Sequence, residues 1–269
     1  GSFHDQAARQ FFGEAIKMKA CDSFRDVFDA VKNGDTEFGV VAIENSLHGS
    51  INPVYRLLAS QDLWVRGEVR LHIQLYLIGS NKNIPGDFSQ ITKVRSQAEA
   101  ISQCDEWLRT NLKDVKIEEA NDTAGSVKSV VLNDDTHTVA IASIEAAKIY
   151  GSTVLAGPIN DDPDNYTRFF ILSKEPEQIP NGNRTSIIIT ENDHDSVGTL
   201  HDVLTVFKNH AINLSKLDSH TLPGKIRRYA FYIDYDENYY SNNSQQAVAM
   251  IKKIGWSVDI LGSYIASEH

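Results

Sequence analysis

The chain has 269 residues, of which 41% are hydrophobic and 23% charged, and its formal net charge is -10. This length and composition suit an ordinary soluble protein of two domains. The acidic balance argues against nucleic acid as a partner, because a phosphate backbone needs a basic face, whereas an anionic small molecule needs only a locally positive pocket. No apolar run approaches the roughly 20 residues of a membrane span, and the N-terminus does not resemble a signal peptide.

The two cysteines, Cys21 and Cys104, lie in helical patterns. They are typical of small buried hydrophobic residues in a reducing cytoplasm, and neither has the spacing of metal ligands. The cysteines therefore predict a cytoplasmic protein without a cysteine metal site, and we find no site for a metal ion or an organic cofactor in the sequence.

The first part of the chain predicts two helices and a buried strand. Apolar residues at helical spacing indicate a helix over 4–19 and a second helix after the capping pair Ser23 and Asp26. The continuous apolar run Phe38–Ile43 indicates a parallel strand that is buried on both faces. Because α/β domains rarely begin with a helix, we expect an upstream strand before Gly1.

A polar loop over Glu44–Ser50 follows that strand, and Asn52-Pro53 opens the next helix. A glycine-bearing loop between the carboxyl end of a strand and a helix N-terminus is the usual ligand position in α/β sheets. Two interpretations stay open: the loop binds a ligand, or Glu44 and Asn45 only cap and turn the chain.

Strict alternation of apolar and polar residues over Val65–Ile78 predicts a long strand that can run from one lobe into the next. A second α/β set follows, with Ser96 and Glu99 as a capping box and with Asp122 and Ser143 opening two later helices. The chain returns near Val154. Two lobes joined in this way would enclose a cleft.

The stretch Asp161–Leu172 is the predicted centre of the chemistry. Its first half is turn-forming, and Phe169–Leu172 indicates a short buried strand. Thr167 and Arg168 lie between the two halves, where a hydroxyl donor beside a guanidinium group suits an anion. The alternative interpretation is an edge strand that carries a solvated arginine.

The C-terminal part predicts a small unit of its own. A linker-like segment over 175–183 precedes it. The pattern over 184–265 is βαββαβ, a ferredoxin-like plait, with a turn at Leu222–Lys225 between its second and third strands.

Taken in order, several motifs resemble those of prephenate dehydratase with a C-terminal ACT regulatory domain, and the similarity runs nearly end to end. The motifs are Gly1-Ser2-Phe3 with Gln6-Ala7-Ala8, Phe38-Gly39-Val40-Val41 through Ile43-Glu44-Asn45-Ser46, Gly49-Ser50, Thr123-Ala124, Tyr150-Gly151 and Asn165-Tyr166-Thr167-Arg168-Phe169. The Glu-Asn-Ser and Thr-Arg-Phe motifs are short, but their order before an ACT-like plait is a specific combination.

The resemblance implies an α/β fold with a two-lobed, periplasmic-binding-protein-like (type II) catalytic domain over residues 1–174 and an ACT domain over 184–269. Lobe one would comprise about 1–70 and 156–174, and lobe two about 71–155. The implied activity is that of a carbon–oxygen lyase, the decarboxylative dehydration of prephenate to phenylpyruvate in phenylalanine biosynthesis. The resemblance also implies a homodimer or homotetramer that binds phenylalanine as an allosteric effector between ACT domains.

The resemblance also assigns residues to three sites. The catalytic residues would be Thr167, Arg168, Asn45 and Ser46. The substrate would be bound by Ser2, Phe3, Glu44, Gly49, Ser50, Thr123, Ala124, Asn165 and Phe169. Phenylalanine would be bound by Gly198, Thr199, Leu200, Asp218, Ser219 and His220. Thr167 would donate a hydrogen bond to the departing ring hydroxyl, and Arg168 would either pair with a carboxylate or brace its loop.

The chain departs from the family pattern at several positions. Ala42 stands where the family prefers Pro, Gln74 where it usually carries His, Gln97 at the His of a Ser-His-Pro stretch, and Asp122 in place of Ser. Asp218-Ser219-His220-Thr221 replaces Glu-Ser-Arg-Pro, so we expect weakened phenylalanine binding. Two alternatives follow: a prephenate decarboxylase that leaves the ring non-aromatic, or a non-catalytic amino-acid or keto-acid sensor of the same fold.

Overall fold

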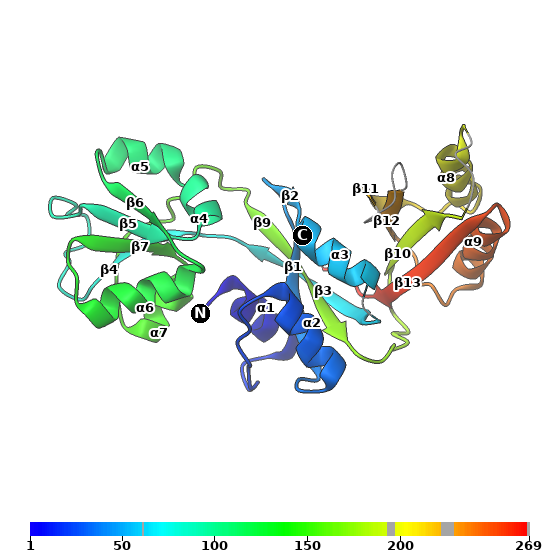
Figure 1. Ribbon diagram of the computed structural model, residues 1–269, viewed down its shortest axis with the longest axis horizontal. Helices are drawn as coiled ribbons and strands as arrows, with labels where there is room; N and C mark the ends of the chain where they lie inside the picture. Colours follow the sequence, from blue (N-terminus) through cyan, green and yellow to red (C-terminus); the bar gives the residue numbers. More distant parts are fainter. Residues whose placement is uncertain (61, 193–196, 222–228, 268–269) are drawn as a thin grey trace. The chain divides into compact units, whose positions relative to one another are not determined.

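The computed structural model describes residues 1–60, 62–192, 197–221 and 229–267, and Figure 1 shows its helices and strands. The chain forms two compact units. Unit 1 comprises Gly1–Met18, Asn45–Gly49 and Leu71–Thr167, and unit 2 comprises Lys19–Glu44, Ser50–Arg70 and Arg168–His269. The predicted turn at Leu222–Lys225 lies outside the described residues. Within the described ranges, no helix is long and apolar enough to cross a membrane.

Unit 1 contains a five-stranded mixed sheet of order β6-β5-β7-β4-β8. Strand β5 runs parallel to β6 and β7, while β4 runs antiparallel to β7 and β8. Helices α4 and α5 cover one face of this sheet and α6 and α7 cover the other (Figure 1). The bounds are β4 (Tyr76–Gly79), β5 (Lys93–Ser96), α4 (Ala98–Ser102), α5 (Asp105–Asn111), β6 (Lys116–Glu119), α6 (Thr123–Asn133), β7 (Thr138–Ala142), α7 (Ile144–Tyr150) and β8 (Thr153–Ala156).

Helix starts in unit 1 follow their capping residues in two predicted places and differ in a third. Asp122 caps α6 by accepting a hydrogen bond from the Gly125 N–H at 2.5 Å, and Ser143 caps α7. The predicted capping box at Ser96 is wrong, because Ser96 Oγ donates to the Ile141 carbonyl at 2.6 Å and Gln97 precedes the helix. Ser96 therefore ties two strands together.

The first helix, α1 (Phe3–Phe12), is shorter than the predicted helix over 4–19. Gly13 follows it with a φ of 85°, a backbone conformation that glycine adopts without the steric cost other residues bear. The apolar pattern continues past Phe12, but the helix ends there.

Most of unit 2 is built on two four-stranded sheets. The first has the order β2-β1-β9-β3, and α2 (Phe24–Asn33) and α3 (Asn52–Ser60) belong to the same unit. Its strands are β1 (Phe38–Asn45), β2 (Gly49–Ser50), β3 (Trp64–His72) and β9 (Tyr166–Ser173). The long strand predicted over 65–78 is interrupted: β3 ends at His72 and β4 begins at Tyr76 in a different sheet.

The second sheet of unit 2 is the predicted βαββαβ plait, with strand order β11-β12-β10-β13. Its elements are β10 (Arg184–Glu191), α8 (Thr199–Asn209), β11 (Leu214–Thr221), β12 (Tyr229–Tyr235), α9 (Asn242–Lys253) and β13 (Trp256–Tyr264). The three sheets give the mixed α/β architecture of two lobes and a C-terminal domain that the sequence predicts. The residue boundaries assigned to the lobes and to the C-terminal domain stay a prediction.

Both faces of the plait are buried within unit 2. Ile187 and Ile189 of β10 pack in a core with residues of α8 and α9. Ile188 points the other way, into a core that it shares with Val41 of β1 and Val54 of α3. Successive residues of a β-strand point to opposite faces. The C-terminal sheet (β11-β12-β10-β13) therefore shares one hydrophobic core with the central sheet (β2-β1-β9-β3).

Gly262 allows β13 to approach the backbone of β3. A Cβ atom placed on Gly262 would lie 2.0 Å from the carbonyl oxygen of Val65, which no side chain can occupy. The absence of a side chain at this position is therefore a packing requirement.

We expect Gly262→Ala to lower the free energy of unfolding by about 1–3 kcal/mol, because overpacking forces the backbone to move. Thermal unfolding measures the effect. Gly182→Ala is the control, since its nearest neighbours would lie at 3.1 Å; equal melting temperatures for the two variants would contradict the close approach.

Candidate active site

The side chain of Asn45, at the end of β1, joins several groups of unit 1. It is 8% exposed, and its Nδ2 donates to Asn165 Oδ1 at 2.7 Å and Thr167 Oγ1 at 3.0 Å. Its Oδ1 accepts hydrogen bonds from the backbone N–H groups of Leu47 and His48 at 3.0 and 3.1 Å. Because both ends of the amide are engaged, the orientation of Asn45 is fixed.

A second set of polar side chains holds this arrangement from behind. The buried Asn165 donates from Nδ2 to Gln103 Oε1 at 2.8 Å. Gln103 Nε2 lies 3.4 Å from His48 Nδ1, which in turn lies 3.1 Å from Asn45 Oδ1. We call Asn45, His48, Gln103, Asn165 and Thr167 the amide cluster. All of its members belong to unit 1.

The loop before β9 is fixed by the side chain of its own Asp161 and by Ser46 of the loop after β1. The Asp161 carboxylate accepts the N–H groups of Glu106 and Trp107 at 2.9 and 3.0 Å, which ties the loop to the start of α5. Ser46 Oγ donates to the Asp164 carbonyl at 3.0 Å and accepts the Tyr166 N–H at 2.9 Å. The backbone on both sides of Asn165 is therefore held in place.

The cluster leaves Thr167 ready to donate a hydrogen bond. Its oxygen accepts from Asn45, so its own proton is free to point toward a different acceptor. Asn and Gln amides do not titrate, and a fixed donor costs little reorganisation when charge develops on an oxygen nearby. The site thus offers an oriented, uncharged donor.

The other residues assigned to substrate binding in the amino-terminal and second-lobe motifs have local structural contacts. Ser2 caps α1 by accepting the Asp5 N–H at 3.2 Å, and Phe3 packs against the core of unit 1. Thr123 and Ala124 are buried at the start of α6. Among the described hydrogen bonds, those of Ser2 and Ser46 do not reach a member of the amide cluster, and Ser46 instead holds the backbone of Asp164 and Tyr166 on either side of Asn165.

Glu44 and Ser50, also assigned to substrate binding, contact the C-terminal sheet within unit 2. Glu44 Oε1 lies 3.0 Å from Lys216 Nζ, and Ser50 Oγ donates to Asp218 Oδ2 at 2.5 Å. Burial raises the pKa of Asp218, but the hydrogen bond from Ser50 and the nearby His220 and Lys216 hold it below its ordinary value. Residues assigned to substrate and effector binding therefore meet here.

The remaining assigned residues occupy separate places. Arg168 is 6% exposed and lies among carboxylates of unit 2, and Phe169 is 1% exposed. Gly49 has a φ of 75° at the start of β2. Gly198 precedes α8 with a φ of 89°, followed by Thr199 and Leu200, and Ser219 is exposed on β11.

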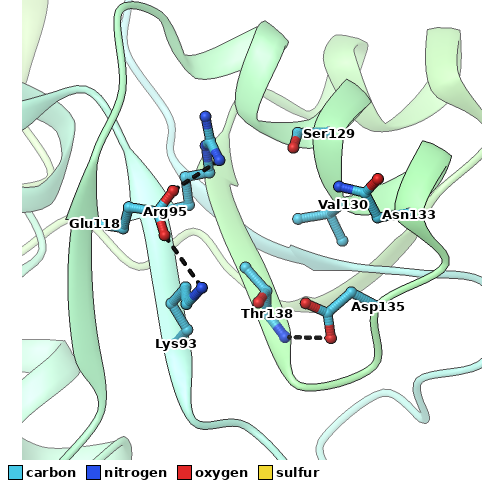
Figure 2. A pocket seen from close by; sticks show the side chains of 8 residues that line it. All are labelled: Lys93, Arg95, Glu118, Ser129, Val130, Asn133, Asp135 and Thr138. Atoms are coloured by element: carbon cyan, nitrogen blue, oxygen red, sulfur yellow. Dashed lines mark hydrogen bonds and ion pairs between the residues drawn. The ribbon is translucent and has the colours of Figure 1, made fainter.

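A small pocket elsewhere in unit 1 holds charged residues that are already paired. It has a volume of about 80 Å³ and lies where β5, β6, β7 and α6 meet (Figure 2). Glu118 lies 3.1 Å from Lys93 Nζ and 2.7 Å from Arg95 Nη1. Because one carboxylate holds both cations, this pocket is not a free anion site. No group of three or more His, Cys, Asp or Glu side chains within the described ranges is placed to hold a metal ion.

Two members of the amide cluster were not predicted from the sequence. Gln103 lies 62 residues from Asn165 in the chain, in a helical pattern that drew attention only to its apolar neighbours. His48 lies in the predicted ligand loop, three residues after Asn45, and that spacing is the one local signal that could have identified it.

The fold and the amide cluster define a two-lobed α/β protein with a hydroxyl–amide site and a C-terminal βαββαβ plait. A family model described as prephenate dehydratase matches residues 1–177. The chain belongs to the prephenate dehydratase family, whose members are lyases of aromatic amino-acid biosynthesis.

Similar proteins carry several names. The bifunctional chorismate mutase/prephenate dehydratase of Aquifex aeolicus is 32% identical, over 98% of this chain and 70% of the relative. Other relatives are named arogenate dehydratase. Prephenate dehydratase from Arthrobacter aurescens in complex with L-Phe matches with a TM-score of 0.87 and 26% identity, over 98% of this chain and 87% of that one. A structure described as GqqA, a novel type of quorum quenching acylase, matches with a TM-score of 0.86 and 25% identity, over 99% and 95%.

We expect Asn45→Asp to lower turnover by about 10- to 100-fold, because a carboxylate of the same shape cannot donate to Asn165 and Thr167 and leaves the hydroxyl misplaced. Steady-state kinetics on the folded variant measure the effect. Asn160→Asp is the matched control, since Asn160 also donates from its amide, to the Ile73 carbonyl, outside the cluster. An equal loss in both variants would show that Asn45 has no special role.

Proposed function

We propose that this protein is a prephenate dehydratase that removes carbon dioxide and the ring hydroxyl of prephenate to give phenylpyruvate. The observation that carries the proposal is the oriented Thr167 hydroxyl, whose oxygen is held by Asn45 at 3.0 Å. The family match and the names of the relatives support the same reaction. The compartment and the oligomeric state predicted from the sequence remain predictions.

In the proposed reaction the C–C bond to the ring carboxylate breaks and its electron pair moves into the ring. The C–O bond opposite breaks in consequence, the hydroxyl leaves as water after gaining a proton, and the ring becomes aromatic. A leaving hydroxyl develops negative charge, so a donor aimed at it stabilises the transition state. Thr167 fills this role as a hydrogen-bond donor, because its hydroxyl is too weak an acid to be an efficient proton source.

Arogenate is the second candidate substrate, since several relatives are named arogenate dehydratase. The two substrates differ at the side chain, which bears a keto group in prephenate and an amino group in arogenate. The amide cluster faces the shared leaving hydroxyl in this proposal, so it does not discriminate between the two.

The test is incubation of the protein with prephenate and, separately, with arogenate at neutral pH, with products identified by mass spectrometry. We expect phenylpyruvate from prephenate, formed faster than phenylalanine from arogenate. A product that keeps a non-aromatic ring would indicate the prephenate decarboxylase. An unchanged substrate in both reactions would favour the non-catalytic amino-acid or keto-acid sensor.

Thr167→Val is the matched control for this assay, because valine keeps the shape and loses the hydroxyl. Removing one oriented transition-state donor is expected to lower kcat by roughly 10²–10³-fold, whereas Thr167→Ser keeps a hydroxyl and should retain more activity. Wild-type turnover in the folded valine variant would remove Thr167 from the mechanism.

We also propose that phenylalanine binds the C-terminal domain and regulates turnover. A relative's structure is described as a complex with L-Phe. In this chain Gly198 lacks a side chain at the start of α8, where backbone N–H groups suit a carboxylate. His220 in place of the family's arginine is expected to weaken the binding.

Calorimetry with phenylalanine, beside tyrosine and tryptophan, checks this proposal. We expect heat of binding with phenylalanine alone, and an effect on activity at the low end of the common coupling range of about 1–3 kcal/mol. The proposal that phenylalanine regulates this protein fails if millimolar phenylalanine gives neither heat of binding nor a change in turnover.

A further inference from the structure

The side chain of Arg168 lies in a buried ionic cluster of unit 2. Its Nε and Nη2 lie 2.6 and 2.5 Å from Glu68 Oε2, and its Nη1 lies 2.5 Å from Asp234 Oδ2. Nη2 also donates to the Tyr264 hydroxyl at 2.9 Å. These contacts engage four of the five N–H groups of the guanidinium: the Nε–H, both N–H groups of Nη2 and one N–H group of Nη1. Little of the guanidinium group is left for a substrate carboxylate.

The partners of Arg168 are themselves held in place. Ser186 Oγ donates to the second oxygen of Asp234 at 2.5 Å and lies 2.6 Å from the Tyr264 hydroxyl. Arg184 Nη1 donates to the second oxygen of Glu68 at 3.1 Å. Two arginines thus face two buried carboxylates, and each also lies near a more exposed one, Arg168 near Glu44 at 3.8 Å and Arg184 near Asp236 at 3.1 Å. Burial works against the charge of Arg168, but Tyr264, Asp234 and Glu68 hold its pKa well above the ordinary value.

The ionic cluster connects strands that are far apart in the sequence. Arg168 lies on β9 and Glu68 on β3, whereas Asp234 lies on β12 and Tyr264 on β13 of the C-terminal sheet. Breaking a buried ion pair leaves an uncompensated charge, so these strands cannot shift independently at low cost.

A second set of contacts connects the C-terminal sheet to β1. Lys216 Nζ, on β11, lies 3.0 Å from Glu44 Oε1 and 3.1 Å from Ser50 Oγ, and Ser50 also donates to Asp218. Glu44 immediately precedes Asn45, and Arg168 immediately follows Thr167. Each of the two central residues of the amide cluster is therefore the chain neighbour of a residue tied to the C-terminal sheet.

We propose that Arg168 is a positioning residue that fixes the start of β9, and with it the Thr167 hydroxyl, according to the state of the C-terminal sheet. This inference rests on the proposed function of Thr167. A ligand that shifts β11 or β12 would act on turnover through Asp234 and Arg168. Arg168 does not bind the substrate carboxylate in this account.

The decisive variant is Asp234→Asn in the full-length chain, which keeps the shape and removes the charge that faces Arg168. We expect kcat to fall roughly 10- to 100-fold, as for a donor displaced by about 1 Å, with KM changed less than about twofold. Phenylalanine should still bind by calorimetry but change turnover less than in the wild type. Hydrogen exchange should quicken at the amides of residues 166–169.

The matched control is Asp236→Asn. Asp236 lies two residues further along the chain and pairs with Arg184 at 3.1 Å rather than with Arg168. The same chemical change there should leave kcat and the exchange of residues 166–169 within about twofold of wild type. Equal effects of the two variants would overturn the proposal.

Arg168→Lys separates positioning from substrate binding. Lysine keeps the charge but cannot contact Glu68, Asp234 and Tyr264 together, so we expect a lower kcat with little change in KM. A raised KM at unchanged kcat, together with wild-type behaviour of Asp234→Asn, would assign Arg168 to the substrate instead and reject the proposal.

Two further measurements keep the test independent of folding and of substrate. If Asp234→Asn does not fold, Ser186→Ala takes its place, because it removes one hydrogen bond to Asp234 and keeps all charges. We expect a smaller fall in kcat and a smaller rise in hydrogen exchange at residues 166–169. No change in either quantity would overturn the proposal. If the wild type converts neither substrate, the proposed function fails, whereas unchanged exchange at residues 166–169 in Asp234→Asn rejects the positioning role by itself.

Discussion

Adjacent residues of a β-strand point to opposite faces, and the arrangement of this protein depends on that alternation at two neighbouring strands. At the end of β1, Asn45 joins the amide cluster while Glu44 faces Lys216. At the start of β9, Thr167 accepts from Asn45 while Arg168 pairs with Asp234. Two pairs of consecutive residues thus place neutral hydrogen-bonding groups on one side and charges on the other.

The two sides differ in what they require of their surroundings. Amides and hydroxyls can be buried at modest cost when their donors and acceptors are paired. In the amide cluster a chain of hydrogen bonds from Gln103 to Thr167 pairs them. The ionic cluster has a larger desolvation penalty, so it contributes little net stability but strongly penalises any arrangement in which one partner is missing. It specifies a geometry more than it stabilises a fold. Such rigidity suits Arg168 as the neighbour of Thr167, the proposed hydrogen-bond donor.

The sequence predicted those features that short stretches determine and missed those that need distant partners. Apolar runs identified β1 and β9, and local capping identified the starts of α6 and α7. The helix over 4–19 failed because a single positive φ at Gly13 overrides the apolar pattern. Thr167 and Asn45 could be named from motifs, yet their contact spans 122 residues. No local pattern distinguishes an arginine that binds a ligand from one whose partners lie 66 and 100 residues away.

The shared core of unit 2 limits how this protein can change over evolutionary time. The family match ends at residue 177, but Tyr232 and Leu261, beyond that point, pack in the same core as Val41. A chain shortened at the match boundary would expose apolar surface on its central sheet to water, at a cost that scales with the area uncovered. The plait is therefore part of the core whatever else it does, and any ligand response that it has is lost more readily by point substitution than by deletion of the domain.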